Sequence, residues 1–169
     1  ALVCVGFDLC SVGCIVLVHV IRGGSSADTT PRTYAQRKAW VESHHDPYAV
    51  FVTTVPATDA ATEGGERIIG FSALSVFYDR AGYDGVTDLA YYIAPEWQGR
   101  GAGTFTLAKL LDECRNRHMR KACGIIFADN RGSIALMKHF GFTQFGLMPQ
   151  AATDSTGTMR DMSYWHLDL

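Results

Sequence analysis

The sequence has no excess of charge of either sign. Its 169 residues include 15 lysines and arginines against 17 aspartates and glutamates, a formal net charge of −2 at pH 7. The basic residues are scattered along the chain instead of clustered. Proteins that bind nucleic acid usually present a basic face that neutralises phosphates. DNA and RNA are therefore not expected as partners.

Cysteine is present, but its spacing builds no recognisable site. The count is odd and no Cys-x-x-Cys pair occurs among Cys4, Cys10, Cys14, Cys114 and Cys123. Neither a disulfide framework nor a zinc site is indicated, so we expect buried thiols, a reducing, cytoplasmic compartment and no metal. A soft metal held by Cys10 and Cys14, one helical turn apart, is the alternative.

The chain also lacks a clean long hydrophobic run. Its most apolar stretch extends from Leu2 to Ile21, but Asp8 interrupts it and no lysine or arginine precedes it. A membrane-spanning helix needs about 20 predominantly apolar residues. A signal peptide needs a basic region ahead of its apolar core. We expect no membrane association, with a cleaved or anchored N-terminus as the alternative.

What is present indicates one α/β domain over residues 1–169, with no repeat and no linker. Helical spacing predicts helices from Thr33 to His44, from Ala102 to His118 and from Asn130 onward. Alternating or apolar runs predict strands at Tyr48–Val55, Arg67–Val76, Thr87–Ile93, Lys121–Phe127, Thr143–Met148 and Met159–Leu167. The order of these elements implies a three-layer α/β/α sandwich with a mixed sheet.

The chain is organised around a glycine-rich junction at residues 91–104. The strand ending at Ile93 is stopped by Pro95, three glycines follow between Gly99 and Gly103, and a helical pattern begins at once. Glycines let the backbone approach a ligand, and the first-turn N–H groups of a helix have no intrahelical partner. The junction is therefore predicted to bind a phosphate.

Two common nucleotide motifs are not satisfied there. A Walker loop needs a Lys-Ser/Thr ending that Gly103-Thr104-Phe105 lacks, and Gly-x-Gly-x-x-Gly is not completed. The run Gln98-Gly99-Arg100-Gly101-Ala102-Gly103 instead fits Gln/Arg-x-x-Gly-x-Gly/Ala. It resembles the pyrophosphate-binding motif of the Gcn5-related N-acetyltransferases (GNAT), which bind acetyl-CoA. Taken alone, the motif is also compatible with a merely structural turn.

A second motif lies downstream. The run from Asp129 to Phe142 is similar to the family's Asn-x-x-(Ala/Ser)-x-x-Leu…Gly-Phe signature, with Asn130 at the start of a helix. The resemblance narrows to the phosphinothricin and methionine sulfoximine N-acetyltransferases through Asp8-Leu9, Arg37-Lys38-Ala39-Trp40, Met148-Pro149-Gln150 and Leu167-Asp168-Leu169. It implies the GNAT fold with a splayed sheet, an edge strand at Leu2–Val5 and a helix capped near Asp8.

The resemblance also implies a binding site for acetyl-CoA. The turn amides and the Arg100 side chain would bind its pyrophosphate, main-chain groups near Tyr92 and Ile93 would bind its pantetheine arm, and Asn130, helped by Ser133, would hold that arm. The cofactor-binding residues expected on this basis are Tyr92, Ile93, Gln98, Gly99, Arg100, Gly101, Ala102, Gly103, Thr104, Asn130 and Ser133.

Acetyl transfer to an amine requires a base, because a free amine has a pKa near 10 and is protonated at neutral pH. Asp88 stands where relatives carry a catalytic glutamate and, one methylene shorter, is expected to act through a water. Its alternative is a strand-edge carboxylate without a catalytic role. The Ile93 amide is the expected donor to the thioester oxygen.

The leaving thiolate has no obvious acid. Many GNAT proteins place a tyrosine seven residues after the asparagine, and this chain has Met137 there. Methionine has no proton to donate. The thiolate would leave unprotonated or through water, with Tyr91 or His139 as weak substitutes.

The expected acceptor is the primary amine of a small molecule other than phosphinothricin. After Gln150, relatives carry a basic and aromatic run, whereas residues 151–161 here have lost most of those groups. Asp154 would repel a substrate carboxylate, so a cationic amine is favoured. Relatives pair through their C-terminal strands, which is compatible with a homodimer.

Other functions remain open at this stage. A non-catalytic acetyl-CoA-binding sensor or interaction domain would keep the two binding motifs while lacking a base and an acid. A different acyl donor or an oxygen acceptor would use the same fold.

Overall fold

The structure is a computed structural model that describes residues 2–4, 19, 21–22, 25–57 and 65–169. The helix expected near Asp8 and the thiols of Cys10 and Cys14 lie outside these residues.

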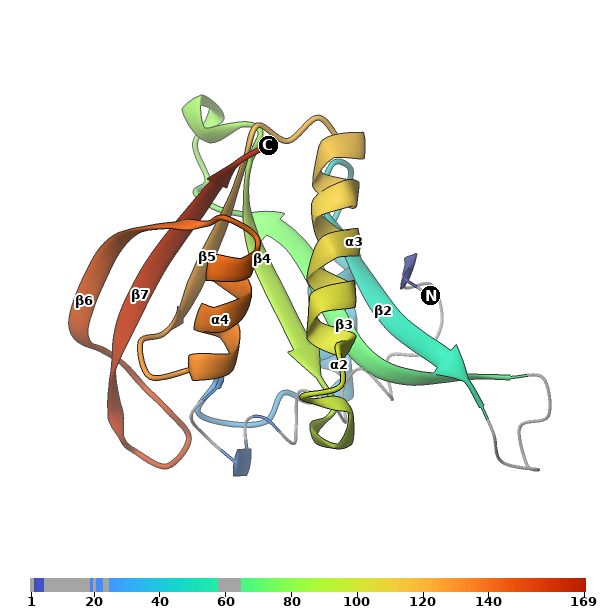
Figure 1. Cartoon of the computed structure of the whole chain (residues 1–169), viewed down its shortest axis with the longest axis horizontal. Coiled ribbons are helices and arrows are strands. Elements are labelled where there is room, and N and C mark those ends of the chain that lie inside the picture. Colours follow the sequence, from blue (N-terminus) through green and yellow to red (C-terminus); the bar gives the residue numbers. More distant parts are fainter. Residues whose placement is uncertain (1, 5–18, 20, 23–24, 58–64) are drawn as a thin grey trace.

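Seven strands form one mixed sheet in the described part of the chain, in the order β1-β2-β3-β4-β5-β7-β6 (Figure 1). All neighbouring pairs are antiparallel except β4 and β5. The strands are β1 (Leu2–Cys4), β2 (Ala49–Pro56), β3 (Glu66–Val76), β4 (Val86–Ile93), β5 (Lys121–Phe127), β6 (Thr143–Thr153) and β7 (Met159–Asp168).

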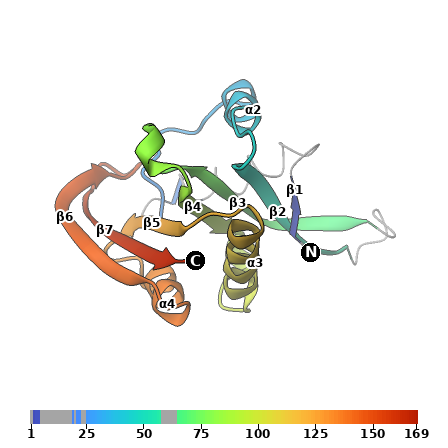
Figure 2. The ribbon, with the colours of Figure 1, turned by 90° about the horizontal axis from the view of Figure 1, so that it is seen from above.

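Helices cover both faces of the sheet, which confirms the three-layer sandwich. Helix α2 (Tyr34–Glu42) lies on one face, and α3 (Ala102–Asn116) and α4 (Arg131–His139) lie on the other (Figure 2). Short 3₁₀ turns, η2 (Ala81–Tyr83) and η3 (Pro95–Trp97), flank β4. Helix α2 begins with a capping box in which Thr33 and Gln36 exchange hydrogen bonds.

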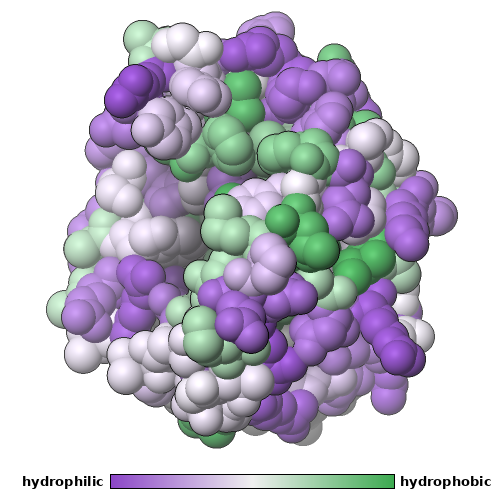
Figure 3. Space-filling view, turned by 90° about the vertical axis from the view of Figure 1, so that its left-hand side faces the viewer, coloured by the Kyte–Doolittle hydropathy of each residue, from purple (hydrophilic) through white to green (hydrophobic). Residues whose placement is uncertain are grey.

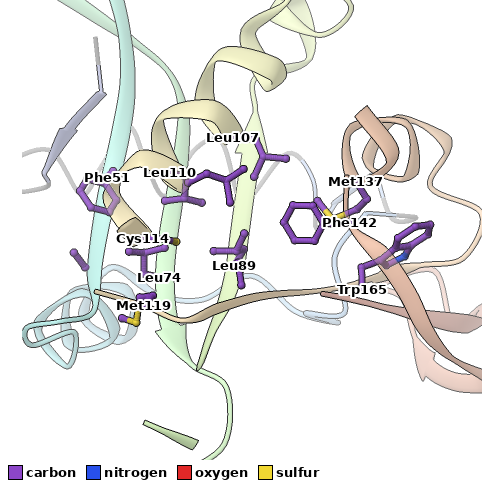
Figure 4. Close-up of a cluster of buried hydrophobic side chains, with 13 residues drawn as sticks. Phe51, Leu74, Leu89, Leu107, Leu110, Cys114, Met119, Met137, Phe142 and Trp165 are labelled. Atoms are coloured by element: carbon purple, nitrogen blue, oxygen red, sulfur yellow. The ribbon is translucent and has the colours of Figure 1, made fainter. Parts of the chain in front are cut away.

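The main core lies between the sheet and helices α3 and α4 (Figure 4). Leucines at helical spacing on α3, Leu107, Leu110 and Leu111, are almost completely buried. Met137 of α4 and Trp165 of β7 extend the same cluster. Each fully buried side chain of this size contributes about 1.5–3 kcal/mol to folding. This packing holds α3 and α4 firmly against the strands that lead into the glycine-rich turn.

The sheet opens between β4 and β5. The two strands pair only where Val86–Asp88 run beside Lys121–Cys123. Beyond Asp88, β4 stays paired with β3 as far as Ile93 but has no partner on its other side among the described residues. The expected splay of the sheet is therefore present, and it begins at Asp88.

The sequence predicts that the strand beginning at Thr143 ends at Met148, and this prediction is wrong. Strand β6 continues to Thr153, with an irregular register between Met148 and Ala152. Gln150 sits there at a φ of 49°, and its N–H bonds to the Asp161 carboxylate at 2.8 Å. Residues 149–151 face only Asp161 in the register, so this segment is a bulge within a long hairpin, and the strand continues past it.

No helix in the described part of the chain is long and apolar enough to cross a membrane.

Candidate active site at the opening of the sheet

A cavity of about 1260 Å³ occupies the opening between β4 and β5. Side chains alternate between the two faces of a strand, and Ala90 and Tyr92 pack on the α2 side. Asp88, two residues before Ala90, therefore lies on the α2 side as well. Leu136 of α4 lines the cavity from the opposite side of the sheet. The cavity thus joins the two faces of the molecule.

The main-chain groups of Ile93 face this opening. The Ala94 N–H bonds to the Ile69 carbonyl at 2.8 Å, so Ile93 and its register partner Gly70 form a non-hydrogen-bonded pair. Both the N–H and the C=O of Ile93 consequently point away from β3. The carbonyl accepts hydrogen bonds from His19 Nε2 at 2.9 Å and Gln98 Nε2 at 3.1 Å. The N–H points to the same side, away from β3.

The same alternation corrects the expectation for Tyr92. Its register partner Phe71 makes it a hydrogen-bonded pair, so its N–H and C=O belong to the β3–β4 ladder. Its ring is stacked on Phe71, with centroids 5.1 Å apart. The main-chain groups open to a cofactor arm are those of Tyr91 and Ile93.

The glycine-rich turn leads into helix α3, whose N-terminus has no side-chain cap. Gly101 is the N-cap of α3 at a φ of 84°, a conformation in which other residues are strained, and no side chain caps the helix. The first helical bond runs from the Phe105 N–H to the Gly101 carbonyl. The N–H groups of residues 102–104 are left for an anion, with the positive end of the helix dipole behind them.

Most of the predicted turn residues line the cavity, namely Gln98, Gly99, Gly101, Gly103 and Thr104. Arg100 and Ala102 do not line it, and the Arg100 side chain is exposed to solvent. Gly103 has a packing role, because a Cβ there would lie 3.1 Å from Leu136 Cδ1. It therefore permits the close approach of α3 and α4.

The second predicted binding element is the start of α4. Asn130 caps this helix through Oδ1, which accepts a hydrogen bond from the Ser133 N–H at 3.1 Å. The cap leaves the Asn130 side-chain N–H groups for another partner. Both Asn130 and Ser133 line the cavity.

Asp88 has the electrostatics of a base. Burial raises the pKa of its carboxyl to about 7. Its Oδ1 atom is buried and has no hydrogen-bond partner among the described residues. Its register neighbours, Ser75 on β3 and Cys123 on β5, carry no charge that would pair with it. A carboxylate poised near neutrality can accept a proton and release it again.

Asp154 does not have the role expected for it. Its side chain is buried and bonds to Arg160 Nη2 at 2.9 Å. Hydrogen bonds from Thr156 and Arg160 hold the pKa of Asp154 below its usual range. Arg160 also pairs with Asp129, next to Asn130. Asp154 is thus neutralised within the β6–β7 turn and presents no free charge to an acceptor.

Comparison with known proteins assigns this arrangement to a family. The sequence model of the acetyltransferase (GNAT) family matches residues 22–142. The chain belongs to this family. This GNAT acetyltransferase is 31% identical over 121 residues to a phosphinothricin N-acetyltransferase of Streptomyces coelicolor, covering 70% of this chain and 67% of the relative. It is 26% identical over 160 residues to an L-methionine sulfoximine/L-methionine sulfone acetyltransferase of Pseudomonas aeruginosa, covering 93% and 88%.

Solved structures agree with the sequence relatives. A GNAT-superfamily phosphinothricin acetyltransferase from Sinorhizobium meliloti, solved in complex with acetyl-CoA, matches with a TM-score of 0.84 and 26% identity, covering 100% of this chain and 88% of that one. A ribosomal-protein-alanine N-acetyltransferase from Brucella melitensis has the same fold, with a TM-score of 0.87 at 24% identity, covering 100% and 99%.

One site residue of this GNAT acetyltransferase was not expected from the sequence. His19 is buried, bonds to the Ile93 carbonyl and to Ser25 Oγ, and lies 5.2 Å from the Tyr92 ring. Burial lowers the pKa of His19, which favours the neutral imidazole. Because Nε2 faces a carbonyl, it must carry the proton. The contact spans 74 residues of sequence, and a lone histidine in an apolar segment gives no signal of it.

The residues considered for the acid differ in their burial and surroundings. Met137 is completely buried in the core. His139 is exposed, although it lines the cavity. Tyr91 faces the α3 and α4 side, packed against the core that contains Met137.

Proposed function

We propose that this acetyltransferase moves the acetyl group of acetyl-CoA to the primary amine of a small molecule by direct attack on the thioester. One observation carries the proposal. The cavity at the opening of the sheet contains both Asp88, with a near-neutral pKa, and the outward-facing N–H of Ile93. A base for the amine and a donor for the developing oxyanion therefore share one space.

The residues around the opening fit acetyl-CoA. The uncapped N–H groups at the start of α3 would bind the pyrophosphate, with the exposed Arg100 side chain beside them. The N–H of Ile93 and the main chain of Tyr91 would meet the pantetheine arm, and Asn130 with Ser133 would hold it from α4. The acetyl-CoA complex of the Sinorhizobium meliloti relative supports this choice of donor.

Asp88 supplies the base in this proposal. As a carboxylate it takes a proton from the substrate ammonium, directly or through one water, which leaves the nitrogen lone pair free to attack. The Ile93 N–H then stabilises the negative charge that develops on the thioester oxygen. Removing a comparable oxyanion donor from other enzymes costs about 10²–10³ in rate.

We propose an acceptor that lacks an acidic group. The absence of basic groups other than Arg160 from residues 151–161 supports this, since Arg160 is already paired with Asp154 and Asp129. Asp88 provides a negative charge for an incoming ammonium. Asp154 adds no net negative charge for the acceptor, because Arg160 neutralises it.

We further propose that two copies pair through β6. This strand is the last of the sheet in the described part of the chain and exposes Phe145, Leu147 and Met148 by 51–55%. Figure 3 views this side of the molecule, where hydrophobic side chains lie between hydrophilic ones. Exposed edge strands and apolar surface are usually covered.

The proposal is tested by thiol release from acetyl-CoA across a panel of primary amines, namely aromatic amines, polyamines, aminoglycosides, neutral amino-acid amides, phosphinothricin and methionine sulfoximine. We expect the highest kcat/KM for an amine without an acidic group. Turnover of phosphinothricin or methionine sulfoximine far above all other amines would refute the acceptor class. Acetyl-CoA binding without transfer to any amine would favour a sensor domain.

A further inference from the structure

The hydroxyl group of Tyr91 is buried and has no hydrogen-bond partner at bonding geometry among the described residues. Buried hydroxyl groups are nearly always paired, because an unpaired one loses its hydrogen bonds to water without compensation. Tyr91 also lines the cavity. An orphaned donor at a cavity indicates a partner that arrives with the ligand.

The surroundings of Tyr91 place it on the α3 and α4 side of the opening. It lies two residues before Ile93 on β4, and its side chain packs against the buried cluster that contains Leu89 and Met137. The Ser133 side chain in the first turn of α4 is its polar neighbour. Met137, one turn further along α4, carries no proton to donate.

Asp88 and Tyr91 therefore lie on opposite faces of the sheet, one on each side of the opening. The amine reaches the acetyl carbon from the face that carries its base, Asp88. The sulfur of the leaving group then departs toward the other face, where Tyr91 and Ser133 are found. This step rests on the proposed function.

We propose that Tyr91 is the acid that protonates the leaving thiolate. The nitrogen lone pair forms the C–N bond, the C–S bond breaks with its electron pair on sulfur, and the Tyr91 hydroxyl proton passes to that sulfur. The tyrosinate regains a proton from the acylated nitrogen through water, and Asp88 releases the proton of the original ammonium to solvent. The products are one amide, one thiol and one proton.

The local environment keeps Tyr91 in the donor form. Burial raises the pKa of its hydroxyl above the ordinary value for tyrosine. The group therefore stays protonated throughout the pH range in which Asp88 ionises.

The kinetic test is Tyr91→Phe, with Tyr48→Phe as the matched control, because Tyr48 also packs against the core but lies outside the cavity. With acetyl-CoA we expect kcat to fall about 10–100-fold in Tyr91→Phe and to stay unchanged in Tyr48→Phe. With the acetyl thioester of a nitrothiophenol, whose thiolate leaves without an acid, the loss should shrink to less than threefold. An equal loss with both donors, or no loss, would overturn the proposal.

A binding measurement tests the proposed contact between the Tyr91 hydroxyl and the CoA sulfur without turnover. Wild-type protein should bind CoA about tenfold more tightly than desulfo-CoA above the pKa of the thiol, and Tyr91→Phe should bind both equally. The melting temperature of Tyr91→Phe should match or exceed that of the wild type, because the change removes an unpaired hydroxyl. Retention of the CoA preference in Tyr91→Phe would contradict the role.

The proposed acetyl transfer and the proposed acid role of Tyr91 can be refuted independently of each other. Transfer by wild-type protein with an unaffected Tyr91→Phe variant would refute only the acid. Absence of transfer by wild-type protein to every amine would refute the proposed function.

Discussion

Asp88 is largely buried and lies at the point where β4 and β5 separate. Burial makes its charged form costly, and its Oδ1 has no hydrogen-bond partner within the described residues, so its pKa is raised to about 7. The folded protein therefore holds the Asp88 proton more tightly than the unfolded chain, whose aspartates titrate near 3.9. Stability conferred by the protonated carboxyl is present below about pH 4 and is lost as pH rises to about 7.

Asp88→Asn should therefore stabilise the fold at high pH. We expect a gain of roughly 2–4 kcal/mol in the free energy of unfolding at pH 8, because the amide cannot ionise, with the gain shrinking toward pH 4. Urea denaturation between pH 4 and pH 8 measures it. Asp79→Asn, on an exposed loop, is the control for replacing an aspartate by asparagine. A pH-independent difference for Asp88→Asn would contradict the burial argument.

Several contacts of single residues in the site could not be predicted from the sequence. The family resemblance led us to expect free main-chain groups near Tyr92 and Ile93, but which peptide groups face the opening depends on the Ala94–Ile69 hydrogen bond, which no local pattern reveals. Because of that bond, the main-chain groups of Tyr91, and not those of Tyr92, face the opening together with those of Ile93. The contacts of His19 with Ile93, and of Arg160 with Asp154, are likewise tertiary.

At the scale of elements, the β4–turn–α3 unit was predictable because alternation, a proline and three glycines all indicate the same structure. Strand β6 was not, because Pro149 and Gln150 suggest a loop, while pairing with β7 carries the strand past them as a bulge. Proline and glycine patterns thus place local turns well. They do not reveal a tertiary partner that overrides them.

The glycine turn provides a test with an internal control. Gly101 and Gly157 have φ values of 84° and 81°, and a Cβ at either would meet no atom within 4 Å. Alanine at each should cost a similar 1–2 kcal/mol of stability, measured by chemical denaturation. Only Gly101→Ala should raise the KM for acetyl-CoA, by about tenfold, since it alone reshapes the start of α3. Equal effects on KM would argue against binding there.

At the scale of the whole molecule, the two faces of the sheet meet at one opening, so a donor held by α3 and α4 can meet an acceptor on the α2 side. The order of the elements predicted helices on both faces of the sheet, and the family resemblance predicted the splay. Beyond β5, strands β7 and β6 complete the sheet.

The proposed pairing through β6 is tested by Leu147→Glu. A charge at the centre of the apolar edge should convert a dimer into a monomer in sedimentation equilibrium, because a buried unpaired carboxylate is costly. Tyr34→Glu, at the exposed start of α2, should leave the dimer intact. A wild-type protein that sediments as a monomer at high concentration would refute the pairing.

We propose that Asp88 deprotonates an amine acceptor within the cavity. The most direct measurement is the pH dependence of single-turnover acetyl transfer from acetyl-CoA to the best amine of the panel, for wild-type protein and Asp88→Asn. For wild type the rate should rise with pH through an apparent pKa of about 7 as the carboxyl ionises. Asp88→Asn should be slower by about 10²–10³-fold at pH 8 and lack that step. An Asp88→Asn variant with an unchanged rate and the same pH profile would contradict the account.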